Sequence, residues 1–438
     1  MFKREELLGR TFACSCGQTH TVGTRIIRYA EDAVAHLPAD LASCAPGRRV
    51  AVLADTRTWA IAGRQATESL RRQGWSCQEF IVPDRGGKSP VCDDVTFDDL
   101  NARFPEVDAA LAVGCGVVTD LTKWLAFEHD VPFAVLATAP TMNGFTSANV
   151  APAIDGVKTL LVARAPVAVF AVPSIMAAAP FELAAAGLGD AIAKPVSTAD
   201  WVLNHLFNAE PFCKPCSELI NSLEAYYFEF PEHLRERRPQ AIEALVNALL
   251  YSGIAMTMIG TSAPASGGEH LLSHTLDMMS ALDGQEHDLH GRQVGVGTIV
   301  AAVLYEKVLH VERPEPAPLP DMDGAFWGPR VDHVGRQYEQ KIPVVEAMAG
   351  KMRQGGLWRD FVDRGRPLVR PPSQIKDCLR RAGAAHTCAD IGCSPDRVRC
   401  AMLHMHEIRK RPTVVDLAWM LGILPGAVDD IVEDWLMD

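Results

Sequence analysis

The segment DAALAVGCGVVTDLTKWLAF, at positions 108–127, predicts a buried strand that leads directly into a helix. Its first six residues are almost all apolar, as expected of a strand that is covered on both faces of a sheet. Gly114 and Gly116 then allow a tight turn, after which a helix is expected through Phe127. This strand–turn–helix unit indicates a parallel α/β sheet.

The same pattern recurs on either side of this unit. Buried strands are predicted at 49–54, 79–82, 133–137 and 167–172, and a helix is expected after the first of them, through Arg71. Strands that alternate with helices in this way form a wound, Rossmann-like parallel sheet. In such sheets, ligands bind at the carboxyl ends of the strands.

The chain changes character after about residue 180. Long apolar stretches with helical spacing occur at 240–259, 295–308 and 414–421, and strand signals become rare. A proline-rich segment at 312–329 is expected to form a surface loop. We therefore predict an α/β domain over residues 1–180 and an all-helical domain over residues 181–438.

Composition excludes several classes of function. The chain has 438 residues and a formal net charge of -12, so no basic face is expected for nucleic acid or anionic lipid. Its most apolar stretch, at 167–181, is interrupted by Pro173 and Pro180 and is too short to cross a membrane. The N-terminus shows no apolar signal segment, and twelve cysteines in a chain of this length are no disulfide scaffold. We expect a cytoplasmic protein.

Three histidines and one aspartate are candidate metal ligands. In EHLLSH, at 269–274, His270 and His274 would lie on one face of a helix because they are four residues apart. His290 precedes another apolar helix, and Asp190 ends the glycine-containing segment AGLGD. Two imidazoles and one carboxylate would leave a position open for substrate, as in catalytic metal sites. The alternative is a set of histidines that are solvated or that cap a core.

Two loops at strand ends are candidate sites for a dinucleotide. The small residues of GCGVVTDLTK, at 114–123, would let backbone N–H groups approach a pyrophosphate, although Thr119 replaces the third glycine of the usual fingerprint. A simple tight turn is the alternative. The second loop, ATAPTMNGFTS at 137–147, lies where a ligand is expected. Asp55, at the end of the first strand, would accept a hydrogen bond from a ribose or cap the next helix.

Taken in this order, the motifs resemble those of the iron-type alcohol dehydrogenase and dehydroquinate synthase superfamily, and most closely those of bacterial sn-glycerol-1-phosphate dehydrogenases. The resemblance covers most of the chain. It rests on CSCGQTH at 14–20, the glycine turn at 114–123, TAPTMNGFTS at 138–147, GLGDAIAK at 187–194 with Asp200 and Trp201, SGGEHLLSH at 266–274, HGRQVG at 290–295 and IRKRPTVVDL at 408–417.

The resemblance implies a metal-dependent oxidoreductase that reduces dihydroxyacetone phosphate to sn-glycerol 1-phosphate with NADH or NADPH, and that forms a homodimer or a higher oligomer. Asp190, His270 and His290 would bind one divalent metal ion, which is zinc, nickel or iron in such enzymes. His274 and Asp190 would be the catalytic residues, with His274 beside the phosphorylated substrate as a proton relay. Asn143, Asp190 and His274 would contact that substrate. The α/β domain would bind the dinucleotide through Asp55, Gly114, Gly116, Val117, Val118, Thr119, Asp120, Lys123, Thr138, Ala139, Pro140, Thr141 and Ser147.

One substrate position departs from the family pattern. Asn143 stands where these dehydrogenases usually carry aspartate, which favours another phosphorylated or phosphonate ketone or aldehyde as an alternative substrate. A dehydroquinate synthase-like cyclase and a non-catalytic regulator are further alternatives. Basic residues near the motifs are sparse, which argues against the cyclase. Asp55 favours NADH because its charge would repel a 2′-phosphate.

Two cysteine motifs have no place in this scheme. Cys14, Cys16 and His20 offer three possible metal ligands without an obvious fourth, so a structural turn is the simpler interpretation. Cys213 and Cys216 have CxxC spacing but lie in the helical half, away from a thioredoxin-like strand end. We interpret the second pair as non-catalytic.

Overall fold

The computed structural model describes residues 4–222 and 224–437, which form two compact units. The sheet unit contains the described residues 4–187, 218–222 and 233–261, and the helical unit contains 188–217, 224–232 and 262–437. The helix Pro239–Ile259 (α13) therefore belongs to the sheet unit, although it follows residue 180 in the chain. The functional division of the chain at residue 180 stays a prediction.

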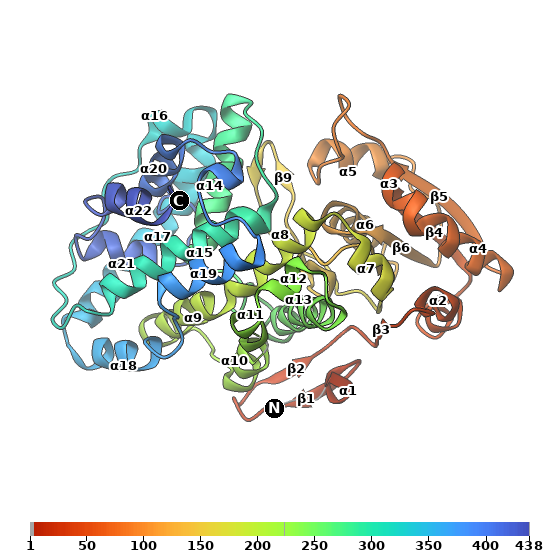
Figure 1. The fold of residues 1–438 in the computed structure, drawn as a ribbon, viewed down its shortest axis with the longest axis horizontal. Helices are drawn as coiled ribbons and strands as arrows, with labels where there is room; N and C mark the ends of the chain where they lie inside the picture. The colour runs from red at the N-terminus through yellow and green to blue at the C-terminus, as the bar shows by residue number, and fades with distance from the viewer. Residues whose placement is uncertain (1–3, 223, 438) are drawn as a thin grey trace. The chain divides into compact units, whose positions relative to one another are not determined.

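Among the described residues, a six-stranded parallel sheet forms the centre of the sheet unit (Figure 1). Five of its strands confirm those expected from the sequence. The additional edge strand, at 26–29, has only four residues, and one of them is the charged Arg28. In pairing order the strands are β3 (Ile26–Tyr29), β12 (Ala168–Ala171), β7 (Phe133–Ala137), β6 (Ala109–Gly114), β4 (Arg49–Asp55) and β5 (Ser76–Val82).

Helices cover both faces of this sheet. α2 (Ala33–Ala42) and α4 (Arg64–Arg72) pack on one face, where their apolar residues join alternate strand residues in one buried core. α13 covers the opposite face near the ends of β7 and β12, and α6 (Gly116–Glu128) packs against β6. Because both faces are buried at β6, β7 and β12, these three strands are continuously apolar in sequence.

The remaining elements of the sheet unit are short. They are α1 (Arg4–Leu7), α3 (Thr56–Thr58), the π-helical turn η1 (Trp59–Gly63), α5 (Asp94–Asn101), the 3-10 turn η2 (Asn143–Phe145), α7 (Pro173–Ala178), and the hairpins of β1 (Thr11–Ala13) with β2 (Thr19–Thr21), β8 (Asn149–Val150) with β11 (Leu161–Val162), and β9 (Ala153–Ile154) with β10 (Val157–Lys158).

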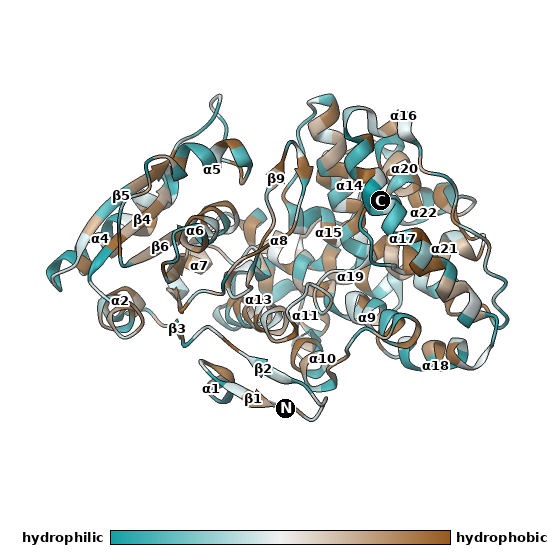
Figure 2. Cartoon of the chain, turned by 180° about the vertical axis from the view of Figure 1, so that it is seen from behind, coloured by the Kyte–Doolittle hydropathy of each residue, from teal (hydrophilic) through white to brown (hydrophobic). Residues whose placement is uncertain are grey.

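Within the described residues, α13 is the one helix that is long and apolar enough to cross a membrane. In its most apolar window, 67% of the residues are buried inside the protein. A helix that is hydrophobic on most of its surface is expected in the core of a large protein. The colouring of Figure 2 contrasts this helix with the charged surface helix α4. We interpret α13 as a core helix.

The helical unit is organised around α14 (Gly268–Asp283) and α15 (His290–Val308), which pack along each other (Figure 1). α15 is buried along nearly its whole length. The helices expected at 240–259, 295–308 and 414–421 are confirmed, although α15 already begins at His290. Three helices have residues in both units, namely α8 (Phe181–Ile192), α10 (Lys214–Asn221) and α12 (Glu232–Arg235). The other helices of the helical unit are α9 (Lys194–Asn208), α11 (Ala225–Glu229), α16 (Gly324–Trp327), η3 (Gly328–Arg330), α17 (Val331–Met352), α18 (Gly356–Gly365), α19 (Pro372–Ala382), η4 (Ala389–Ile391), α20 (Pro395–His404), α21 (Val414–Met420) and α22 (Val428–Trp435).

Two glycines of the helical unit let helix backbones touch. A Cβ atom at Gly189 of α8 would lie 2.0 Å from the carbonyl oxygen of Gly291, at the start of α15. A Cβ atom at Gly297 of α15 would lie 2.2 Å from the carbonyl oxygen of Glu269, in α14. Any side chain at either position would therefore push the helices apart. These contacts set the spacing of the three helices that carry the candidate metal ligands.

We predict that Gly297→Ala lowers the free energy of unfolding by about 1–3 kcal/mol, because α14 and α15 must separate to admit the methyl group. The matched control is Gly350→Ala in α17, where a Cβ atom meets nothing within 4 Å. This control should be neutral or stabilising by up to about 1 kcal/mol. Urea unfolding followed by circular dichroism measures both changes. Equal stability of the two variants would contradict the close packing of α14 and α15.

Candidate functional site

The helical unit brings the four candidate metal-site residues together from three helices. Asp190 lies on α8, His270 and His274 lie on α14, and His290 is the first residue of α15. The His270 Nε2 lies 3.6 Å from the Asp190 Oδ1, and the ring centroids of His270 and His290 are 5.2 Å apart. Asp190 and His270 are buried, whereas His274 and His290 are partly exposed. The cluster thus has a buried side and a side that reaches solvent.

A buried glutamate fixes the orientation of the His270 ring. The Glu269 Oε1 lies 2.8 Å from the His270 Nδ1 and also accepts from the Gly267 backbone N–H at 2.8 Å. Because a carboxylate can only accept, the His270 Nδ1 carries the proton of this hydrogen bond. The neutral ring therefore presents an unprotonated Nε2 on the side of Asp190. The sequence analysis gave Glu269 no role.

A serine and a glutamine fix the His290 ring in the same way. The Ser273 hydroxyl donates to the Gln293 Oε1 at 2.8 Å and lies 2.9 Å from the His290 Nδ1. A hydroxyl has one proton to donate, so His290 must be the donor in the second bond. His290 therefore also carries its proton on Nδ1 and leaves Nε2 unprotonated. Ser273 and Gln293 were not recognised from the sequence.

Lys194 is a further charged member of the cluster. Its Nζ donates to the Asp190 Oδ1 at 2.7 Å and to the Ala265 carbonyl oxygen at 2.9 Å. Burial by itself would raise the pKa of Asp190, but the positive charge of Lys194 opposes this effect, and the pKa lies below its usual range. Asp190 is therefore an anion at neutral pH.

Asp200 of α9 supports the start of α14. Its Oδ2 accepts from the Gly268 backbone N–H at 2.6 Å, and its Oδ1 accepts from the Tyr305 hydroxyl at 2.6 Å and the Val414 backbone N–H at 2.7 Å. Burial, and then the negative charge of Glu269, raise the pKa of Asp200 to about 7. The side chain thus joins α9, α14, α15 and α21 next to the residues that orient His270.

The second candidate site lies at the carboxyl edge of the sheet. The strand order reverses between β4 and β6, because β4 leads to β5 on one side and β6 leads to β7 on the other. Wound sheets bind their ligands at such a reversal. Asp55 ends β4 and Gly114 ends β6, and the register that pairs Leu53 with Ala112 makes the two ends neighbours. The sheet therefore brings these predicted cofactor residues to one edge.

Asp55 has a structural role at this edge. Its side chain accepts from the backbone N–H groups of Arg57 at 2.9 Å and Thr58 at 2.8 Å, which caps α3. The Arg57 guanidinium lies 3.4 Å from the Asp55 Oδ2 and is also paired with Asp84. A cation therefore stands beside the carboxylate at the strand end. The predicted preference for NADH rests on Asp55 alone and stays a prediction.

The loop after β7 is held by α13. The Thr146 hydroxyl donates to the Leu250 carbonyl oxygen at 2.6 Å, and the Asn143 Nδ2 lies 3.4 Å from the Ser252 Oγ. A Cβ atom at Gly253 would lie 2.3 Å from the Asn143 carbonyl oxygen. The loop and the helix thus meet at backbone distance, and Asn143 remains partly exposed.

Lys123, a buried residue of α6, holds the same loop through hydrogen bonds. Its fully buried Nζ donates to the carbonyl oxygens of Gly144 and Asn149, each at 2.8 Å, and lies 3.3 Å from the Ser147 Oγ. Burial lowers the pKa of Lys123, and Asp120 opposes that shift. Lys123 is thus placed as a brace of the loop, and its predicted contact with a dinucleotide stays a prediction.

The other predicted cofactor residues follow the ends of β6 and β7 in the chain. Some are buried and others are partly exposed. The buried ones are Gly114, Val118, Thr119, Thr138, Ala139, Pro140 and Ser147, and the partly exposed ones are Gly116, Val117, Asp120 and Thr141.

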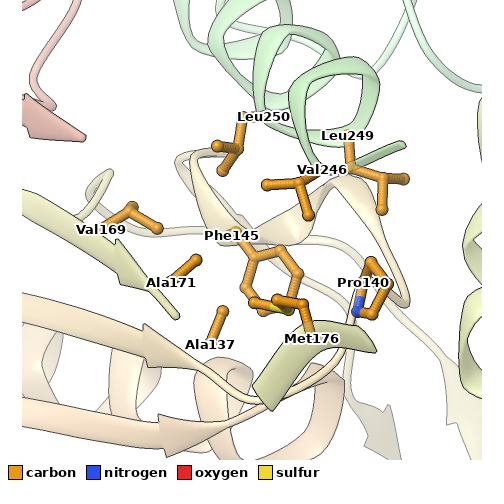
Figure 3. A pocket seen from close by; sticks show the side chains of 9 residues that line it. All are labelled: Ala137, Pro140, Phe145, Val169, Ala171, Met176, Val246, Leu249 and Leu250. Atoms are coloured by element: carbon orange, nitrogen blue, oxygen red, sulfur yellow. The ribbon is translucent and has the colours of Figure 1, made fainter. Parts of the chain in front are cut away.

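A small apolar pocket lies between this loop, the sheet and α13. Figure 3 shows Phe145 near its centre, with side chains of strands, of α7 and of α13 around it. None of its lining residues is titratable, so the pocket is a packing feature that carries no chemistry. The lining residues are Ala137, Pro140, Phe145, Val169, Ala171, Met176, Val246, Leu249 and Leu250.

The fold and the first part of the chain are similar to those of known alcohol dehydrogenases. Residues 28–180 match the iron-containing alcohol dehydrogenase family. The structure is similar to glycerol dehydrogenase from Schizosaccharomyces pombe, with a TM-score of 0.60 at 17% identity over 94% of this chain and 90% of that one. It is also similar to NADH-dependent butanol dehydrogenase A from Thermotoga maritima, with a TM-score of 0.58 at 16% identity over 91% and 96%. These likenesses show that the chain has the fold of these dehydrogenases.

Relatives in sequence define the family more narrowly. A glycerol-1-phosphate dehydrogenase from Geobacillus thermodenitrificans is 36% identical over 364 residues, which are 83% of this chain and 84% of the relative. One from Halalkalibacterium halodurans is 28% identical over 408 residues, which are 92% and 94% of the two chains. The chain belongs to the glycerol-1-phosphate dehydrogenase family, as the resemblance predicted.

We predict that Lys123→Met lowers the free energy of unfolding by about 1–3 kcal/mol, because buried carbonyl groups of the loop lose their charged donor. The matched control is Lys88→Met, at an exposed position, which should change stability by less than about 0.5 kcal/mol. Chemical denaturation of both variants measures the difference. An unchanged stability of Lys123→Met would show that Lys123 does not brace the loop.

Proposed function

We propose that this enzyme is a metal-dependent reductase that converts dihydroxyacetone phosphate to sn-glycerol 1-phosphate with NADH or NADPH. The observation that carries the proposal is the convergence of Asp190, His270 and His290, with the Nδ1 atoms of both rings occupied by hydrogen bonds. Relatives over most of the chain bear the name glycerol-1-phosphate dehydrogenase.

The donor set suits a catalytic divalent ion. One carboxylate and two imidazole Nε2 atoms are three ligands of the kind that zinc, nickel and iron accept, and three protein ligands leave a position for substrate. The orienting contacts of Glu269 with His270 and of Ser273 with His290 are of the kind that metal-ligating histidines typically have. We propose Asp190, His270 and His290 as the ligands.

In this proposal the chain's own residues prepare the site before substrate arrives. A divalent ion bound there would supply Lewis-acid chemistry that polarises the carbonyl group of the ketone as hydride is delivered. Glu269 keeps the His270 Nε2 unprotonated and correctly turned, and Ser273 does the same for the His290 Nε2. Asp190 contributes a negative charge at neutral pH.

His274 is the proposed source of the proton that completes the alcohol. It lies one helical turn after His270 on the same face of α14, and its ring stacks on that of His290 at a centroid distance of 5.6 Å. It is partly exposed, so its ring nitrogen can exchange protons with solvent. An imidazole titrates near neutral pH, which suits a group that must donate a proton and regain it.

The coenzyme is proposed to bind at the carboxyl edge of the sheet, around the turn at 114–120 and the loop at 138–147. Asn143 of that loop is the proposed contact to a substrate hydroxyl. An amide offers an acceptor oxygen without the charge of the family's aspartate. This difference favours another phosphorylated ketone or aldehyde as the second candidate substrate.

The experiment that tests the function follows the absorbance of the reduced nicotinamide. Zinc- or nickel-loaded protein is mixed with dihydroxyacetone phosphate and either NADH or NADPH. We expect metal-dependent, stoichiometric oxidation of the coenzyme, whereas a cyclase would consume none. We expect His270→Ala to lose activity together with the metal ion held at Asp190 and His290, because the substitution removes a ligand of that ion. Absence of turnover in protein that holds metal and coenzyme would exclude this substrate, and full activity of His270→Ala would exclude the metal assignment.

The orientation of the ligands can be tested apart from activity. We predict that Ser273→Ala weakens binding of zinc by about 10–100-fold, because the His290 ring loses the acceptor that holds it. The matched control is Ser280→Ala on the same helix, whose hydroxyl contacts Arg397. Competition with a chelator measures the affinity of both variants. Equal affinities would contradict a role of Ser273 in orienting His290.

A further inference from the structure

The hairpin of β1 and β2 gathers three metal-binding side chains that the proposed reaction does not use. Cys14 and Cys16 lie in its turn, and His20 is the middle residue of β2. The two Sγ atoms and a ring nitrogen of His20 all lie within 4.8 Å of one another. The Cys16 Sγ is 3.3 Å from the His20 Nε2. Ligands at about 2.3 Å (sulfur) and 2.0 Å (nitrogen) from a tetrahedral zinc ion would be about 3.5 Å apart.

The backbone of the turn sets the positions of the two thiols. The Cys14 N–H donates to the Gln18 carbonyl oxygen at 2.9 Å, and the Gly17 N–H donates to the Cys14 carbonyl oxygen at 3.0 Å. Gly17 has a φ of 84°, in the left-handed region that favours glycine. The turn is thus closed by its own backbone, and the hairpin presents Cys14 and Cys16 near His20 without rearrangement.

A hydrogen bond to a backbone carbonyl fixes the orientation of the His20 ring, as is common for metal-ligating histidines. Its Nδ1 lies 2.8 Å from the carbonyl oxygen of Met258, in the last turn of α13. Since a carbonyl group only accepts, Nδ1 carries the proton, and the unprotonated Nε2 is the atom next to the Cys16 thiol. Ligating histidines typically donate their other N–H to a carboxylate or a carbonyl in this way. His20 is 2% exposed, whereas Thr19 and Thr21 are exposed.

The hairpin is short. Each strand has three residues, and β1 contributes no buried residue to the described structure. Isolated two-stranded hairpins are marginally stable in water. A metal ion that joins the turn to β2, with His20 bonded to α13, would fix the hairpin on the sheet unit. Metal binding of this kind contributes directly to folding.

We propose that Cys14, Cys16 and His20 bind a structural zinc ion, in addition to the ion proposed at Asp190, His270 and His290. Two thiolates and one imidazole are soft and borderline ligands, which select zinc over magnesium or calcium. Both thiols release their protons when the ion binds, and a fourth ligand completes the tetrahedron. This interpretation replaces the simple structural turn that the sequence suggested.

The first test uses X-ray absorption on zinc-loaded, reduced full-length protein. We expect sulfur neighbours at about 2.3 Å from zinc, and one zinc ion fewer, with no sulfur neighbours, in the double variant C14S/C16S. The matched control Cys44→Ser should retain both the zinc and the sulfur signal. His270→Ala should keep one zinc ion with sulfur ligands, which separates this site from the proposed catalytic one. Zinc with only nitrogen and oxygen neighbours in the wild type would overturn the proposal.

A second test needs no variant that might fail to fold. Alkylation of the wild-type thiols with iodoacetamide, mapped by mass spectrometry, reports which cysteines the ion covers. We expect zinc to slow alkylation of Cys14 and Cys16 by tenfold or more relative to the chelated protein, while Cys44 reacts at the same rate in both. Equal reactivity of Cys14 and Cys16 with and without zinc would overturn the proposal.

Discussion

The contact between the backbones of α14 and α15 is the constraint on which the candidate site depends. Gly297 lies against the Glu269 carbonyl oxygen, and Gly189 brings α8 equally close to the start of α15. Carboxylate and imidazole side chains are short and have few rotatable bonds, so they meet at one point only if their helices nearly touch. The small residues of these helices therefore determine where Asp190, His270 and His290 can converge. The chemistry proposed for this cluster thus depends on the close packing of these helices.

Buried polar groups next to the candidate ligands then determine which ring nitrogen of His270 and of His290 carries the proton. Buried polar atoms are costly unless they are hydrogen-bonded, and in this cluster the bonds form short chains that end on the imidazoles. Glu269 and Ser273 each accept a hydrogen bond from an Nδ1–H group, so both rings expose the nitrogen that a metal ion requires. Lys194 balances the charge of Asp190 in the same buried space. The orientation of the ligands is thus built into the folded chain.

The sequence predicted the large elements well and the small ones poorly. Buried strands and long apolar helices have a clear pattern, whereas β3 has four residues that include Arg28, and the hairpin strands have two or three. The spacing of His270 and His274, with His290 and Asp190 as further candidates, suggested a metal site, and the resemblance to a family then selected Asp190, His270 and His290 as its ligands. Glu269, Ser273 and Gln293 could not be recognised because an orienting contact depends on tertiary packing. The contact of Lys194 with Asp190 could have been predicted from the sequence, because residues four apart lie on the same face of a helix.

The most direct test of this account is anomalous X-ray scattering at the zinc edge, measured on crystals of the active, zinc-loaded enzyme. The account predicts an anomalous peak bounded by the carboxylate of Asp190 and the Nε2 atoms of His270 and His290, with the Nδ1 atoms still bonded to Glu269 and Ser273. An active enzyme with no peak at this position, or with either ring turned so that Nδ1 faces the ion, would contradict it.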